Sequence, residues 1–294
     1  MKNILIISFL LIIGQNVYNQ NIDSLFLDAH AVTLGYGEEY KLERYFIYDK
    51  IDKIHSGEKG IAQIKRKYSL SKNLVSTSNP EINIEQKLLI DKKSVGKNIS
   101  LTTICYIIPY KYELTQILFL QTYFDRNIYL ENQFINYFIG DSIPKYVKNS
   151  AAIDTIDFLG RKIILGNICD WKGPHNISCA NRGQISWSIF QNEEMAKQDI
   201  IIQRYLASKA AFSSIQSEEN VAILFEGIPT TAIKTIIKIN APKIIMGGSN
   251  SLIAYYISQK IRNKNVSCVL SHYTNDFRLD ELPPLLSEFI TLIK

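Results

Sequence analysis

Apolar and polar residues alternate with a period of two over much of the chain, which is typical of half-buried β-strands. The alternation is clear over residues 82–90. Residues 98–109 and 113–124 are both rich in β-branched and aromatic side chains, and Pro109-Tyr110-Lys111-Tyr112 lies near their junction. These two ranges predict an antiparallel hairpin with one largely apolar strand in the middle of a sheet.

The second half of the chain shows more strand patterns. They cover residues 156–165, 184–190, 221–225, 232–239, 251–261 and 266–273. The last two ranges flank Arg262-Asn263-Lys264-Asn265, a sequence typical of a hairpin turn. Residues 21–60 fit a helix or a strand equally well, and we leave them open.

A helical period appears in only three places. Leu130, Phe134 and Phe138 form one apolar stripe that ends before Gly140. A second helix is expected from Asn192, its cap, to about residue 210, and a third over 282–293, with Asp280 as its cap. Strands outnumber helices, so we predict an α+β fold with mainly antiparallel sheets and a few packed helices.

The first twenty residues are typical of a secretory signal peptide. Lys2 provides the positive start, and residues 4–13 form an apolar run that is too short to span a bilayer. We expect cleavage near residue 20. Behind it we expect two closely docked α+β domains, 21–148 and 155–294, joined by a linker within 145–154.

Composition excludes several classes of protein. Hydrophobic residues make up 46% and charged residues 21%, which rules out a disordered chain. Loss of the leader removes one lysine and lowers the formal charge from +5 to +4, too little for a nucleic-acid-binding surface. No other apolar run is long enough for a transmembrane segment in the mature chain. The abundance of Ile, Lys and Asn is expected of an AT-rich bacterial genome.

Residues 169–188 concentrate the unusual side chains. They contain both tryptophans, two of the four cysteines and His175. We expect a loop closed by a Cys169–Cys179 disulfide, which an oxidising compartment permits. Pairing of either cysteine with Cys105 or Cys268 is the alternative, although both of those lie in apolar strand patterns typical of buried thiols.

Two chemical alternatives use the same cysteines. Cys169, His175 and Cys179 could bind a metal, but structural zinc needs a fourth ligand, so we predict no metal site and no cofactor. Cys179 could be a nucleophile with His272 or His175 as its base and Asp276 or Asn275 orienting that base. We therefore name Cys179, His272 and Asp276 as speculative catalytic residues.

The binding candidates lie in the same segment. Trp171 stands between charged Asp170 and Lys172, which would suit an exposed indole at the tip of a loop; the opposing interpretation, in which Trp171 folds inward and fills the core, is slightly favoured. Arg182 could bind a carboxylate or phosphate, and His175 and Gln184 complete the predicted binding surface.

We therefore expect an exported protein, periplasmic or secreted, with a non-catalytic binding role or an envelope-associated structural or assembly role. Its partner would be an envelope protein or a polysaccharide, not nucleic acid. The alternative is a Cys–His hydrolase that acts on envelope or extracellular polymers.

Overall fold

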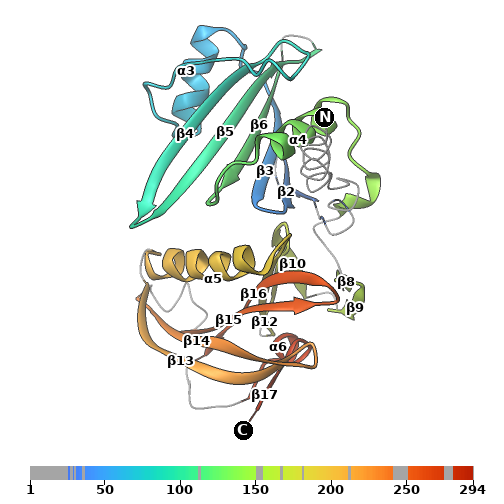
Figure 1. The fold of residues 1–294 in the computed structure, drawn as a ribbon, viewed down its shortest axis with the longest axis vertical. Helices are drawn as coiled ribbons and strands as arrows, with labels where there is room; N and C mark the ends of the chain where they lie inside the picture. Colours follow the sequence, from blue (N-terminus) through green and yellow to red (C-terminus); the bar gives the residue numbers. More distant parts are fainter. Residues whose placement is uncertain are drawn as a thin grey trace, which may run out of the picture.

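Two large, mainly antiparallel sheets and one two-stranded hairpin make up the molecule (Figure 1). The computed structural model describes residues 26, 29, 31–34, 37–111, 114–149, 155–165, 168–180, 182–210, 213–240, 251–274 and 281–293. The signal peptide predicted for 1–20 lies outside these residues. We call the described part up to residue 149 the N-terminal half, and the part from residue 155 the C-terminal half.

The first sheet belongs to the N-terminal half. Its strands lie in the order β4 (Lys87–Gly96), β5 (Ile99–Pro109), β6 (Thr115–Thr122), β3 (Tyr45–Asp52), β2 (Gly37–Leu42), β1 (Ala31–Leu34) and β7 (Lys148–Asn149). All neighbours are antiparallel except β1 and β7. The predicted β5–β6 hairpin is present, and the apolar strand β5 lies between two partners.

Helices cover both faces of the first sheet. α4 (Ile128–Ile139) packs Leu130, Phe134 and Phe138 on one face, as the apolar stripe predicts, and Asn127 caps it. α3 (Glu58–Lys67) packs Ile61 and Ile64 on the other face. A one-turn 3₁₀ helix, η2 (Lys145–Val147), follows α4 and leads into β7.

The second sheet belongs to the C-terminal half. Its strand order is β10 (Cys169–Gly173), β11 (Asn176–Cys179), β12 (Gly183–Phe190), β16 (Lys264–Thr274), β15 (Ser251–Ile261), β14 (Ile228–Ile239), β13 (Ser213–Phe225) and β17 (Ile290–Leu292). The predicted turn between β15 and β16 is formed by Arg262 and Asn263, both with positive φ.

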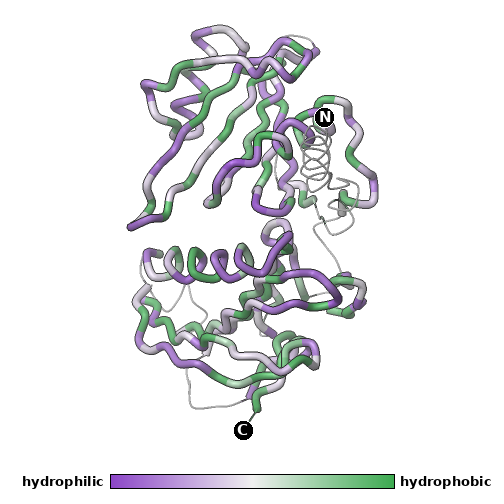
Figure 2. Tube along the Cα trace, viewed as in Figure 1, coloured by the Kyte–Doolittle hydropathy of each residue, from purple (hydrophilic) through white to green (hydrophobic). Residues whose placement is uncertain are grey.

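The second sheet also has two covered faces. α5 (Glu193–Ser208) lies across one face, on the side towards the N-terminal half (Figure 1). The main core of this half lies on the other face, which is covered by the hairpin of β8 (Thr155–Phe158) and β9 (Arg161–Ile164) and by α6 (Pro284–Ser287). Hydrophobic and hydrophilic residues alternate along α5, and the tip of the β4–β5 hairpin is hydrophilic (Figure 2).

The predicted α+β class with mainly antiparallel sheets is thus confirmed. The domain boundary is not tested and stays a prediction. Of the predicted linker, residues 145–149 form η2 and β7, and residues 150–154 lie outside the described residues.

Three predicted elements differ from the structure. The strand expected over 82–90 is shifted to β4, because Asn79 holds the preceding residues in turns, accepting from the Glu81 N–H at 3.1 Å and from Gln86 Nε2 at 2.9 Å. The strand expected over 156–165 is a hairpin, because the chain reverses at Gly160 with φ 88°.

The third difference is the C-terminal helix expected over 282–293. Only the single turn α6 forms, and the chain continues as β17, where Ile290 pairs with Phe225 at the edge of the second sheet. The edge of β13 has backbone groups to pair, so strand addition replaces the helix. The helix cap predicted at Asp280 lies outside the described residues.

Candidate functional site

The predicted loop over 169–188 is a three-stranded part of the second sheet. Cys169 and Cys179 lie opposite each other on β10 and β11, and their sulfurs form the expected disulfide. Cys105 and Cys268 are free and buried, and burial raises the pKa of both thiols. Because Cys179 Sγ is bonded to Cys169, it is not available as a nucleophile or as a metal ligand in this form of the protein.

Trp171 is buried, not exposed at a loop tip. Its exposed fraction is 3%, and its ring lies 5.9 Å from that of Trp187. The reason is the alternation of β10, in which Cys169, Trp171 and Gly173 point inward while Asp170 and the intervening Lys172 point to solvent. The charged neighbours Asp170 and Lys172 therefore lie on the exposed face of the strand, and Trp171 lies on the buried face. The structure thus has Trp171 folded inward.

The other predicted binding residues do not gather around one ligand-sized space. His175 is buried, with its ring stacked on Trp187 at 4.8 Å. Arg182 donates to the Leu165 carbonyl at 2.8 Å. Gln184 is half-buried, and its Oε1 accepts from Ser271 Oγ at 3.5 Å.

The predicted catalytic base is also a buried strand residue. His272 lies on β16 opposite Ile253, and burial lowers its pKa. Asp276 and Asn275 lie outside the described residues. With Cys179 in a disulfide, the described residues do not assemble the nucleophile and base of the hydrolase alternative.

A cavity of about 370 Å³ instead lies between the two halves. Its N-terminal wall comes from β2, β3, β5, β6 and the turns beside them, and its C-terminal wall from the β10–β11 turn, β12 and α5. The polar lining residues are Glu39, Lys41, Arg44, Gln121, Thr122, Lys172, Asn176, Ser186, Ser188, Asp199 and Gln203. The larger apolar and aromatic ones are Phe46, Leu101, Tyr123, Phe124, Trp187, Ile202 and Leu206.

Strand alternation puts Glu39 and Lys41 on the cavity side of β2. Tyr40 and Leu42 point to the opposite face and join the core beneath α4. Burial raises the pKa of the Glu39 carboxyl. The two charged side chains therefore stand about two residue spacings apart on one strand face, where a ligand in the cavity meets both.

Lys41 is a half-buried ammonium without a close counter-ion. No carboxylate of the described residues lies within 4.0 Å of its Nζ, which lies 6.0 Å from the centroid of the Phe190 ring. Burial lowers its pKa, and the more distant charges of Asp199 and Glu43 oppose that effect only in part.

Asp199 faces the cavity from α5. Its exposed fraction is only 6%, yet both of its hydrogen bonds, from Ser267 Oγ and from Gln203 Nε2, reach the same oxygen, Oδ2. Among the described residues Oδ1 accepts no hydrogen bond. A carboxylate oxygen that lines a cavity and accepts no protein hydrogen bond is a strong acceptor for a donor on a ligand.

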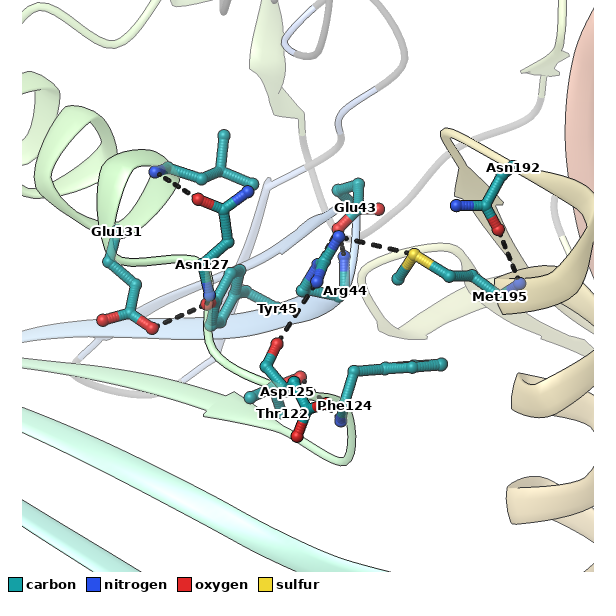
Figure 3. A network of polar contacts seen from close by, with 11 residues as sticks. Glu43, Arg44, Tyr45, Thr122, Phe124, Asp125, Asn127, Glu131, Asn192 and Met195 are labelled. Carbon is teal, nitrogen blue, oxygen red and sulfur yellow. Dashed lines mark hydrogen bonds and ion pairs between the residues drawn. The ribbon is translucent and has the colours of Figure 1, made fainter. Parts of the chain in front are cut away.

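Arg44 links the two halves at the side of the cavity (Figure 3). Its guanidinium contacts Glu43 Oε2 at 2.7 Å and the Asp125 carbonyl at 3.2 Å, and reaches Met195 Sδ of α5 at 3.4 Å. Asn192 caps the same helix by accepting from the Met195 N–H at 2.9 Å. Arg44 is thus already held by protein groups, which leaves Lys41 as the cavity cation with the least compensation.

Further contacts join the halves around the cavity. The rings of Phe124 and Phe190 lie 5.5 Å apart, and Tyr205 Oη donates to the Val95 carbonyl at 3.1 Å. Val32 of β1 is buried in the main core of the C-terminal half. The cavity therefore has walls from both halves, which are packed together beside it.

Sequence reasoning missed this site. Glu39 and Lys41 fall in the range that fitted a helix or a strand equally well, and Asp199 reads as an ordinary polar helix position. One available signal was Asp199 beside Ile200 and Ile202, since an acidic residue near the apolar side of a helix is uncommon.

Comparison with protein-family models finds none that matches the chain, and no curated protein matches it either. The described residues contain no group of three or more His, Cys, Asp or Glu side chains placed to hold a metal ion. Among their helices, none is both long and apolar enough to cross a membrane.

Proposed function

We propose that this chain is an exported binding protein, periplasmic or secreted, and that its ligand binds in the cavity between the two halves. The observation that carries the proposal is the cavity itself. Its volume is at the lower end of the range of about 300–1,000 Å³ for small-molecule sites, and it combines aromatic walls with a few charged groups.

Export is supported by two independent features. The leader pattern of residues 1–20 is typical of a signal peptide. The Cys169–Cys179 disulfide is compatible with an oxidising compartment. A reporter fused after residue 25 should be translocated, and mass spectrometry should find the mature start near residue 21. Intact Met1 on a protein retained in the cytoplasm would refute export.

Ligand binding is tested with a panel of small molecules and with a variant whose new side chain fills the cavity. Thermal shift would be measured with amino acids, short peptides, monosaccharides and oligosaccharides from envelope polymers. Ser186→Phe puts a bulky ring into the cavity, and Ser214→Phe, on an exposed position of β13, is the control. We expect a ligand that stabilises the natural protein and the control but not Ser186→Phe. No stabilising ligand, or equal stabilisation of both variants, would refute the site.

A further inference from the structure

The charges in the cavity are of both signs, and this restricts the ligand. Lys41 presents an ammonium from β2, and Asp199 presents its unengaged Oδ1 from α5. A cationic ligand would meet Lys41, whose charge Asp199 and Glu43 compensate only in part, and a purely anionic one would meet Asp199 and Glu39. A neutral sugar would take both charges out of water without pairing either of them, which is costly.

We propose that the ligand is a small zwitterion of the amino-acid or short-peptide type, with its carboxylate at Lys41 and its ammonium at Asp199. This inference rests on the proposed function. Such a molecule supplies the missing partner of each buried charge, and charge-assisted hydrogen bonds of this kind are the strongest in proteins. Phe46, Phe124 and Trp187 offer apolar surface for its side chain.

The arrangement also explains why the site lies between the halves. Lys41 belongs to the N-terminal half and Asp199 to the C-terminal half, so one ligand bridges both walls with its two charged ends. A molecule that lacks one charged end binds one wall only.

The test uses paired ligands and paired variants. The twenty amino acids, in both configurations, and dipeptides made from them would be screened by titration calorimetry on the mature protein. Each binder is then compared with its N-acetyl and its carboxamide derivative, which remove the positive and the negative end respectively. We expect each derivative to bind the natural protein about tenfold more weakly or worse.

The variants assign each end to its partner. In Lys41→Met the free acid and the carboxamide should bind equally, because the protein no longer has the ammonium that attracts the ligand's carboxylate. In Asp199→Asn the free amine and the N-acetyl form should bind equally. Lys92→Met, at an exposed lysine of β4 that does not line the cavity, should keep both preferences.

Ser267→Ala is a control for the possibility that Asp199→Asn changes binding only because it disturbs the fold. It removes the Ser267 hydrogen bond to Asp199 Oδ2 but keeps the carboxylate, so it should fold and still distinguish the amine from the N-acetyl form. If Asp199→Asn does not fold, the Lys41→Met arm alone still decides the orientation of the carboxylate.

The outcomes separate the two proposals. Zwitterions that bind with unchanged affinity after capping, or preferences that survive in Lys41→Met, would overturn the zwitterion inference. A saccharide that binds the cavity while no amino acid or peptide does would also overturn it, yet would leave the binding function intact. If no ligand of any class binds, the proposed function itself fails.

Discussion

Removal of the Glu226 carboxylate should destabilise the C-terminal half strongly. Glu226 is at the β13–β14 turn with a side chain only 2% exposed, and two arginines bind it: Arg161 at 2.7 and 3.1 Å and Arg262 at 2.5 Å. Arg161 also donates to the Glu288 carbonyl at 2.8 Å, and Arg262 to the Phe158 carbonyl at 3.2 Å. One carboxylate therefore ties three hairpin turns together, β8–β9, β13–β14 and β15–β16.

The magnitude follows from burial. Loss of one partner of a fully buried ion pair costs about 3–5 kcal/mol. Arg161 and Arg262 are 32% and 39% exposed, so water can partly solvate them once Glu226 is gone. We therefore expect Glu226→Gln to lower the free energy of unfolding by about 2–3 kcal/mol. The melting temperature should fall by roughly 5–10 °C.

A control is available in the same cluster. Glu288 is 53% exposed and lies 3.5 Å from Arg161, so Glu288→Gln should cost less than about 1 kcal/mol. Urea unfolding followed by tryptophan fluorescence measures both variants, because both tryptophans lie in the adjoining core. The reasoning would be refuted if both variants lost the same free energy of unfolding, or if Glu226→Gln lost less than about 1 kcal/mol. Either result would show that burial does not determine how much the Glu226 carboxylate contributes to stability.

Three further outcomes are expected. Replacement of Cys169 and Cys179 by alanine should lower the free energy of unfolding in urea by about 2–3 kcal/mol, because the disulfide closes a loop with a sequence separation of ten. If reduction of the natural protein lowers it by the same amount, the loss is due to the disulfide bond and not to the alanine side chains. Burial holds the pKa of His272 below 6.5, so the unfolded chain protonates first and stability should fall as the pH drops below about 6.5. His272→Gln should show a smaller loss between pH 7.5 and 5.5, and an unchanged loss would contradict this. Gly96→Ala should lower the melting temperature by a few degrees, because the new Cβ would lie 2.2 Å from the ring end of Tyr205 and displace its hydroxyl, and an unchanged melting temperature would count against that contact.

The elements with a strong local signal could be predicted. β5, β6, β15 and β16 have continuous apolar or alternating patterns bounded by turn residues, and α5 begins at a side-chain cap. One error occurred where a distant group decides the local structure. β17 exists because the edge of β13 offers it hydrogen bonds, which no pattern within residues 282–293 reveals.

The candidate site depended even more on tertiary structure. The disulfide was predictable because Cys169 and Cys179 are close in sequence and opposite each other in one hairpin. Lys41 and Asp199 are far apart in sequence, and their common cavity exists only once two sheets have packed together. Trp171 drew attention by its charged neighbours, which a strand places on the opposite face.

The burial of Val32 has a consequence for dissecting the chain. This side chain comes from the N-terminal half, lies on β1 beside β7, and fills space in the main core of the C-terminal half. A fragment that starts after residue 154 would lack it and would expose an apolar face where it packs. We expect that fragment to aggregate when produced alone and to be rescued by supplying residues 21–149 as a separate chain. Gene fusions and crystallisation fragments should accordingly keep β1 together with the C-terminal half.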